Sequence, residues 1–163
     1  MADENGNAAP RLNDLAFTPE QASAHHRTLL GEVVRMLCAG VVHGDLSEFN
    51  ILLGADGPVI IDLPQAVDAA GNNHAQRMLL RDVANLRDFF GQFAPELLQT
   101  HYGPEIWDLY QRGLLGADLS LNGQFTHALE HVGDLLCRAF GRLQHRNTVI
   151  GVAHSLVQTP NLG

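Results

Sequence analysis

The first regular pattern of apolar residues lies ahead of residue 40, at Leu30, Val33, Val34 and Leu37. Intervals of three and four predict an amphipathic helix with one apolar face. Its start is indicated by Thr18-Pro19-Glu20-Gln21, in which Thr suits the N-cap, Pro suits the first turn and Gln completes a capping box. Gly40 suits the C-terminal stop.

Three further stretches show the same spacing and predict three more helices. One covers residues 73–93, another begins at Gly103-Pro104 and ends at Gly113, and the last covers residues 124–143. Their apolar faces are, in order, Leu79, Val83, Leu86, Phe90 and Phe93; Ile106, Leu109 and Tyr110, with Trp107 packed beside them; and Leu129, Val132, Leu136, Ala139 and Leu143.

Short apolar runs after the first helix follow a different pattern. Val41-Val42 leads into a polar loop over residues 43–50, and Ile51-Leu52-Leu53 leads out of it. After turn residues 54–57, a run over residues 59–61 ends at Asp62. Runs of this length between turn residues predict a strand, a loop and then a β-hairpin.

The two ends of the chain lack these patterns. Residues 1–17 are polar and rich in Gly, Asn and Ala, which predicts a disordered lead-in, and residues 148–163 form a tail of mixed character. Residues 18–147 are therefore predicted to form one domain of the α+β class, mostly helical. A length of 163 residues with 45% hydrophobic and 17% charged residues fits one such domain.

Asp45, Asn50 and Asp62 give the loop and the hairpin a candidate chemistry. The loop reads His-Gly-Asp-Leu-Ser-Glu-Phe-Asn over residues 43–50, and the hairpin exits at Asp62. Phosphoryl transfer from ATP needs a carboxylate that orients or accepts a proton, and oxygen ligands that hold Mg²⁺ against the phosphates. Asp45 is predicted to be the base, and Asn50 and Asp62 the ligands. The alternative is a turn in which Asp45 and Asn50 only satisfy backbone groups.

This loop, followed by Ile-Ile-Asp-Leu-Pro-Gln-Ala-Val-Asp over residues 60–68, resembles the RIO family of atypical serine/threonine kinases in its bacterial form. The similarity runs from about Leu29 to about Leu115. It implies a kinase or ATPase that uses ATP and Mg²⁺, with Asp45 as proton acceptor and with Asn50 and Asp62 as nucleotide and metal ligands. Asp62 is also implied as a carrier of a transient aspartyl phosphate. For residues 18–147 the implied fold is a protein-kinase-like C-terminal lobe with a short catalytic β-hairpin.

Other features depart from a complete kinase. All ten basic residues are Arg, so no Lys is present to contact the ATP phosphates, and no Gly-x-Gly-x-x-Gly occurs. Only 42 residues precede His43, which are too few for an N-terminal lobe. We therefore expect a C-terminal lobe with the N-terminal lobe absent, weak nucleotide affinity and negligible turnover. The uncovered lobe surface should be apolar, so we expect self-association or a protein partner there.

Three positions around the loop carry further expectations. Gly44 replaces the Arg with which ordinary kinases contact an activation-loop phosphate, so gating by such a phosphate is not expected. His43 is expected to be a hydrogen-bonded brace of the loop. Asp82 is expected either to accept backbone N–H groups of the loop or to form a solvated ion pair with Arg81.

Charge and composition exclude other classes. A formal net charge of −8 with scattered Arg residues argues against direct nucleic-acid binding. No apolar run approaches the length of a membrane span, and the first residues lack a secretion signal, so a cytoplasmic location is expected. Cys38 and Cys137 lie among aliphatic residues and are expected to be buried free thiols.

Two groups of histidines are close enough in sequence to suggest metal sites. His127-Ala128-Leu129-Glu130-His131 matches an inverted zincin pattern, but no Glu follows Glu130 to supply a third ligand, so zinc is not expected. The pair His25-His26 is expected to lie at the surface.

Three functions remain open from the sequence. The first is a RIO-type kinase or ATPase. The second is a small-molecule phosphotransferase of the aminoglycoside type, although Ser47-Glu48-Phe49 and Leu63-Pro64-Gln65 favour the RIO family. The third is a non-catalytic, pseudokinase-like module that keeps the fold and binds a partner.

Overall fold

A computed structural model describes residues 9–116 and 120–125 of the chain. The helices within these ranges are α1 (Pro19–Cys38), α2 (Ala75–Gly91) and α3 (Tyr102–Gln111). Four short strands are β1 (Val41–Val42), β2 (Ile51–Gly54), β3 (Gly57–Ile60) and β4 (Val67–Asp68). Short 3-10 helices are η1 (Leu12–Asp14), η2 (Glu48–Asn50), η3 (Leu63–Gln65) and η4 (Pro95–Gln99). This part of the chain is mostly helical and of the α+β class, as predicted.

Helix α1 begins and ends as its sequence predicts. Thr18 Oγ1 accepts the N–H of Gln21 at 3.2 Å, and Gln21 Oε1 accepts the N–H of Thr18 at 3.0 Å, which completes the capping box. Pro19 occupies the first turn. After the C-cap, Gly40 has φ +80°, a left-handed conformation that favours glycine.

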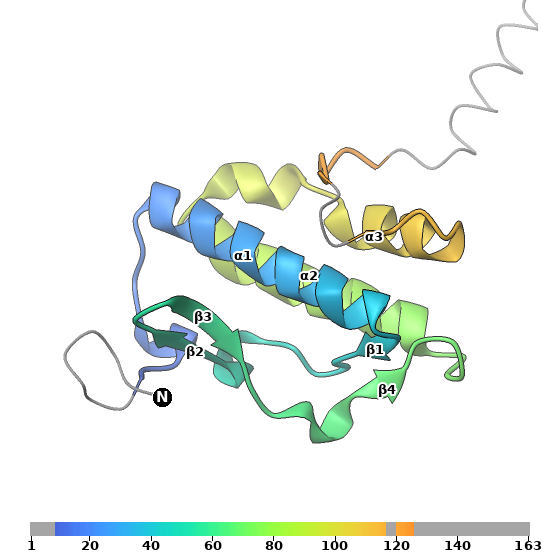
Figure 1. The fold of residues 1–163 in the computed structure, drawn as a ribbon. Helices are drawn as coiled ribbons and strands as arrows, with labels where there is room; N and C mark the ends of the chain where they lie inside the picture. The colour runs from blue at the N-terminus through green and yellow to red at the C-terminus, as the bar shows by residue number, and fades with distance from the viewer. Residues whose placement is uncertain (1–8, 117–119, 126–163) are drawn as a thin grey trace, which may run out of the picture. The chain divides into compact units, whose positions relative to one another are not determined.

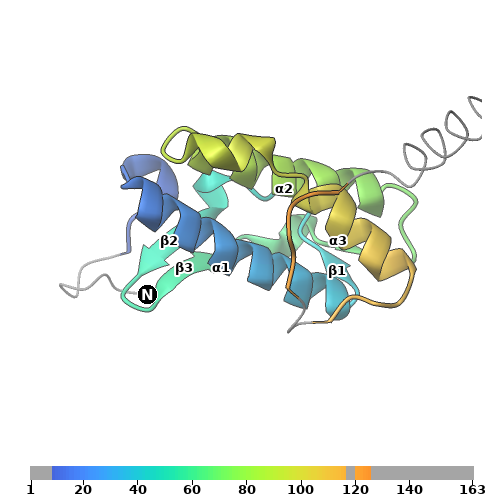
Figure 2. The same ribbon diagram turned by 90° about the horizontal axis from the view of Figure 1, so that it is seen from above.

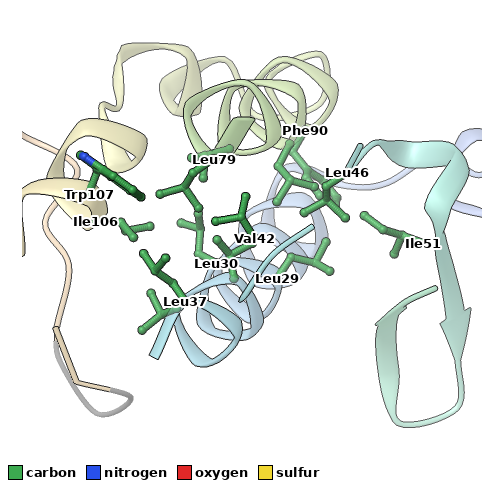
Figure 3. Packing of buried hydrophobic residues seen from close by; sticks show 14 of the residues in the cluster. Leu29, Leu30, Leu37, Val42, Leu46, Ile51, Leu79, Phe90, Ile106 and Trp107 are labelled. Carbon is green, nitrogen blue, oxygen red and sulfur yellow. The ribbon is translucent and has the colours of Figure 1, made fainter. Parts of the chain in front are cut away.

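Helices α1 and α2 lie side by side and run antiparallel (Figures 1 and 2). Each carries a stripe of buried side chains at helical spacing, and these stripes meet in one hydrophobic core that also takes in β1, the polar loop and α3 (Figure 3). The labelled members of that core are Leu29, Leu30, Leu37, Val42, Leu46, Ile51, Leu79, Phe90, Ile106 and Trp107.

Two antiparallel two-stranded sheets lie on one side of the helix pair (Figure 1). Strands β2 and β3 form the predicted hairpin, with Ile51 opposite Ile60 and Gly54 opposite Gly57. Strand β1 pairs with β4, so that Val41 lies opposite Asp68 and Val42 opposite Val67. The hydrophobic pattern did not predict β4, because a two-residue strand is too short to show alternation.

The segment ahead of α1 differs from the expected disordered lead-in. Residues 1–8 lie outside the described ranges, but Leu12 is buried, and the N–H of Leu53 donates to the carbonyl of Pro10 at 2.9 Å. Phe17 packs in an aromatic group, with its ring centroid 5.5 Å from that of Phe93. The polar composition of the segment as a whole did not indicate that its few apolar residues are packed. These residues attach residues 9–17 to β2 and α2.

The end of α2 also differs from the predicted helix over residues 73–93. The helix ends at Gly91, and Pro95 begins the separate 3-10 helix η4. A Cβ at Gly91 would lie 2.6 Å from Cγ of Leu98, so the Leu98 side chain of η4 packs directly against this glycine. Pro95 has no N–H to donate to the carbonyl of Gly91, so α2 ends there although Phe93 continues its apolar spacing.

Two surface predictions are wrong within the described residues. His26, expected at the surface, is buried between the rings of Phe90 and Tyr102, with centroid distances of 5.9 Å and 5.7 Å. Cys38, expected to be buried, is exposed because it lies in the last turn of α1 beyond its apolar stripe. The predicted helix over residues 124–143 lies, apart from its first two residues, outside the described ranges, as do Cys137, the His127–His131 pattern and the tail.

No helix among the described residues combines the length and apolar character needed to cross a bilayer. The domain limits of 18–147 and the cytoplasmic location stay predictions.

Burial of His26 predicts a pH-dependent stability. Burial lowers the pKa of His26 to about 4 from an ordinary 6.5, and its Nε2 has no hydrogen-bond partner among the described residues. The folded state therefore favours neutral histidine, and the unfolded state takes up a proton as pH falls below 6.5. The contribution is complete above pH 6.5 and is lost as pH falls toward 4.

We expect the free energy of unfolding at about pH 5 to fall by about 2 kcal/mol through His26 alone, relative to neutral pH. Urea unfolding of the wild type and His26→Phe at both pH values measures this, since the variant should lose most of the difference. His74→Gln, at an exposed histidine, is the control and should keep the wild-type difference. An unchanged pH dependence in His26→Phe would contradict the assignment.

Candidate active site

Helix α2 binds the polar loop over residues 43–50 through hydrogen bonds. Asp82, almost fully buried, accepts the N–H of Gly44 at 2.7 Å and the N–H of Leu46 at 3.1 Å. Burial raises the pKa of the Asp82 carboxyl, while these two hydrogen bonds act in the opposite direction. Two roles were expected for Asp82. It accepts backbone N–H groups of the loop, and it forms no ion pair with Arg81.

Two neighbours of Asp82 complete this contact, and the sequence pattern predicted neither of their roles. Arg81 Nη2 donates to the carbonyl of Gly44, and Asn85 Nδ2 donates to the carbonyl of Leu46 at 2.9 Å. Because these side chains lie within about one turn of α2, one helix face binds both N–H and C=O groups of the loop. The helix pattern marked this face only as polar.

Gly44 occupies a position that admits no larger residue. Its φ is +83°, and a Cβ there would lie 2.9 Å from Met78 Cε and 3.0 Å from the carbonyl oxygen of Gln65. Glycine is therefore required by the backbone conformation and by the close approach of η3 and α2. This requirement explains why the position carries no arginine.

His43 connects the loop to the exit of the hairpin. Its ring is buried, with Nε2 3.0 Å from the carbonyl of Ile61, while Nδ1 accepts the N–H of Asp45 at 3.3 Å. Both contacts are satisfied by the neutral tautomer that carries its proton on Nε2. The prediction that His43 braces the loop is confirmed.

Asn50 and Asp62 stand at the open end of the hairpin. The N–H of Ile61 donates to the carbonyl of Asn50 at 2.9 Å, which extends the β2–β3 pairing and brings the residue before Asp62 beside Asn50. Asn50 Nδ2 donates to the backbone carbonyl of Asp45 at 2.7 Å. The backbone of Asp45, the side chain of Asn50 and the approach to Asp62 are therefore linked by hydrogen bonds.

Asp62 has an unusual backbone. Its φ of 66° and ψ of 60° are left-handed, and it is the only residue other than glycine with positive φ among the described residues. Such a conformation costs about 1 kcal/mol or more for a residue with a Cβ. The side chains of Asp45 and Asp62 are exposed and that of Asn50 is half-buried, so none is enclosed by hydrocarbon.

The donor set fits a magnesium ion that is only partly bound by protein. Among the described residues, nothing donates a hydrogen bond to Asn50 Oδ1 or to the Asp62 carboxylate, so these oxygens are available. No group of three or more His, Cys, Asp or Glu that could hold a metal occurs in the same residues. Mg²⁺ commonly takes one or two protein oxygens and completes its shell with water and phosphate. The roles of Asp45, Asn50 and Asp62 stay predictions.

An apolar cavity of about 510 Å³ lies next to this site. It is lined by Glu32, Met36, Ala39, Val41, Pro58, Val59, Ile60 and Leu63. Leu63 directly follows Asp62, and its side chain is 53% exposed. The cavity therefore places apolar surface beside the hairpin exit.

Comparison with known proteins agrees with the resemblance to the RIO family over this part of the chain. Residues 1–102 match a family model described as the RIO domain. The chain is 38% identical over 98 residues to the serine/threonine-protein kinase RIO1 of Chaetomium thermophilum, which covers 54% of this chain and 18% of that protein. It is 44% identical over 86 residues to the probable serine/threonine-protein kinase RIO1 homolog of Encephalitozoon cuniculi, with 52% and 21% covered. The chain thus spans only about a fifth of these relatives.

Among solved structures, the chain is similar to the crystal structure of the Rio2 kinase-ADP/Mg²⁺-phosphoaspartate complex from Chaetomium thermophilum. The TM-score is 0.45 at 30% sequence identity, and the alignment covers 52% of this chain and 28% of that one.

The hydrogen bonds of Asp82 predict a large effect of one substitution. In Asp82→Asn only the amide oxygen can accept, so one of the N–H groups of Gly44 and Leu46 loses its partner in a buried place. We expect the free energy of unfolding to fall by about 2 kcal/mol. Denaturant unfolding measures this, with Asp88→Asn as the control, because Asp88 lies exposed on the same helix and, among the described residues, pairs only with Arg87. Equal stabilities of the two variants would contradict the role of Asp82.

Proposed function

Because the chain belongs to the RIO domain family, we propose that it acts as a RIO-type serine/threonine kinase or ATPase that transfers a phosphoryl group from Mg-ATP. The observation that carries this proposal is the set of hydrogen bonds that joins the backbone of Asp45, the side chain of Asn50 and the carbonyl of Ile61 next to Asp62. These hydrogen bonds support one site at the open end of the hairpin.

Each side chain has a proposed task. The Asp45 carboxylate, exposed at the loop, orients the acceptor hydroxyl or water and accepts its proton. Asn50 Oδ1 and the Asp62 carboxylate bind Mg²⁺, which when present neutralises charge on the ATP phosphates. The family resemblance also supports Asp62 as the residue that carries a transient aspartyl phosphate.

Other proposed functions rank lower. The match to the RIO domain disfavours a phosphotransferase of the aminoglycoside type. A non-catalytic binding module is the second candidate, because the 163 residues contain no Lys and no Gly-rich loop to hold the triphosphate. We therefore propose weak nucleotide affinity and negligible turnover for this polypeptide alone.

Titration calorimetry with ATP, with and without Mg²⁺, tests the site. We expect weak binding that depends on Mg²⁺, and a loss of affinity of at least about tenfold in Asp62→Asn, which removes a metal ligand. Asparagine tolerates left-handed backbone, so this variant changes the charge at Asp62 without adding strain. Asp45→Asn should keep the affinity, since Asp45 is assigned no metal.

Asp56→Asn is the matched control, because Asp56 is an exposed carboxylate in the turn of the same hairpin. Absence of Mg²⁺-dependent binding in the wild type would favour the non-catalytic module. Turnover well above that of Asp62→Asn would contradict the expectation that the chain is inactive alone.

We also propose that the apolar cavity beside Leu63 mediates self-association or binds a protein partner. Light scattering of the purified chain should show particles larger than a monomer, and Leu63→Glu should return them to monomers. Leu98→Glu is the control, since Leu98 is 43% exposed in η4 and does not line the cavity. A monodisperse wild-type monomer would count against this interface.

A further inference from the structure

A second cavity, of about 440 Å³, opens at the start of helix α2. It is lined by Asn72, His74, Arg77, Met78 and Arg81, so its charged lining residues are both arginines. Arg77 and Arg81 are four residues apart and therefore lie on the same face of α2. The proposed chemistry at the hairpin does not use this cavity.

The two arginines differ in what they bind. Arg81 donates to the carbonyl of Gly44 and is thereby held against the polar loop. Arg77 is exposed and has neither an ion pair nor a side-chain hydrogen bond within residues 9–116 and 120–125. Arg35, Arg87 and Arg112, in contrast, each pair with a nearby carboxylate. Arg77 is thus a cation at the cavity whose charge no described acid compensates.

The first turn of α2 adds to this positive potential. Its N-cap residue, His74, makes no side-chain capping bond, and no acidic residue lies in that turn. Helix α1 has both, with a capping bond from Thr18 and an acid at Glu20. The N-terminal end of a helix carries partial positive charge, so an anion in the cavity would be stabilised by the helix as well as by the arginines.

The cavity lies beside the proposed base. Met78, part of the cavity lining, packs so closely on Gly44 that a Cβ there would lie 2.9 Å from its Cε. Gly44 is the residue directly before Asp45, and Arg81 binds its carbonyl. An anionic group bound at Arg77 and Arg81 would therefore lie near Asp45, the residue proposed to orient the acceptor hydroxyl and accept its proton.

We propose that this cavity binds an anionic side chain of a polypeptide acceptor, namely Asp, Glu or a phosphorylated residue, and so positions a neighbouring hydroxyl at Asp45. The proposal rests on the phosphotransfer function proposed above. A polypeptide is favoured over nucleic acid because the chain has a net charge of −8, which repels a polyanion but admits a single anionic group at a local pair of arginines.

The test uses two serine peptides that differ only in flanking residues, Glu in one and Gln in the other. Binding to the full chain is followed by amide chemical shifts. We expect the Glu peptide to shift the amides of Arg77, Met78 and Arg81, and to bind about tenfold more tightly than the Gln peptide. Arg77→Gln should remove that preference, and Arg77→Lys should restore part of it. Arg27→Gln, at an exposed arginine of α1, should leave it unchanged.

Mg-ATP titration of Arg77→Gln separates this proposal from the proposed function. Unchanged Mg-ATP binding together with loss of the Glu preference supports the acceptor site. Equal binding of both peptides by a wild type that binds Mg-ATP overturns the site and leaves the function standing. Failure of Mg-ATP binding with an intact Glu preference overturns the function and leaves an anion site. A single-stranded RNA that binds more tightly than the Glu peptide, and through Arg77, overturns the choice of a polypeptide.

Discussion

The contact between Asp82 and the backbone of the loop is the constraint on which the site depends. A loop of this kind carries N–H groups that no sheet or helix satisfies, and Asp82 supplies their acceptor from inside the core. Because a buried carboxylate is costly, it is stable only while both N–H groups point at it. Helix and loop are therefore coupled, and the backbone of Asp45 is positioned by a residue on a separate element.

Much of the fold follows from local patterns in the chain. The capping box at Thr18, the apolar stripes of α1 and α2, and the hairpin between Ile51 and Ile60 were all predicted because each signal lies within a few neighbouring residues. Long-range packing was not predictable in this way. The burial of Leu12 and His26 and the pairing of β4 depend on neighbours distant in sequence.

For the candidate site, too, some features were predictable from the sequence and others were not. Residue types and spacing identified Asp45, Asn50 and Asp62 as candidates, and chemistry alone suffices for that because few side chains serve as magnesium ligands or bases. The scaffold behind them was harder to identify. Arg81 and Asn85 bind the loop carbonyls from a helix whose sequence shows only polar positions there, and the left-handed backbone of Asp62 leaves no mark in composition.

That left-handed backbone bears on how the chain would diverge. Glycine adopts φ near +66° without a steric penalty, so replacing Asp62 with glycine would relieve strain. Drift under selection for folding alone would favour that change. Under the proposed function, aspartate at this position gives up some backbone stability for a carboxylate that glycine cannot supply.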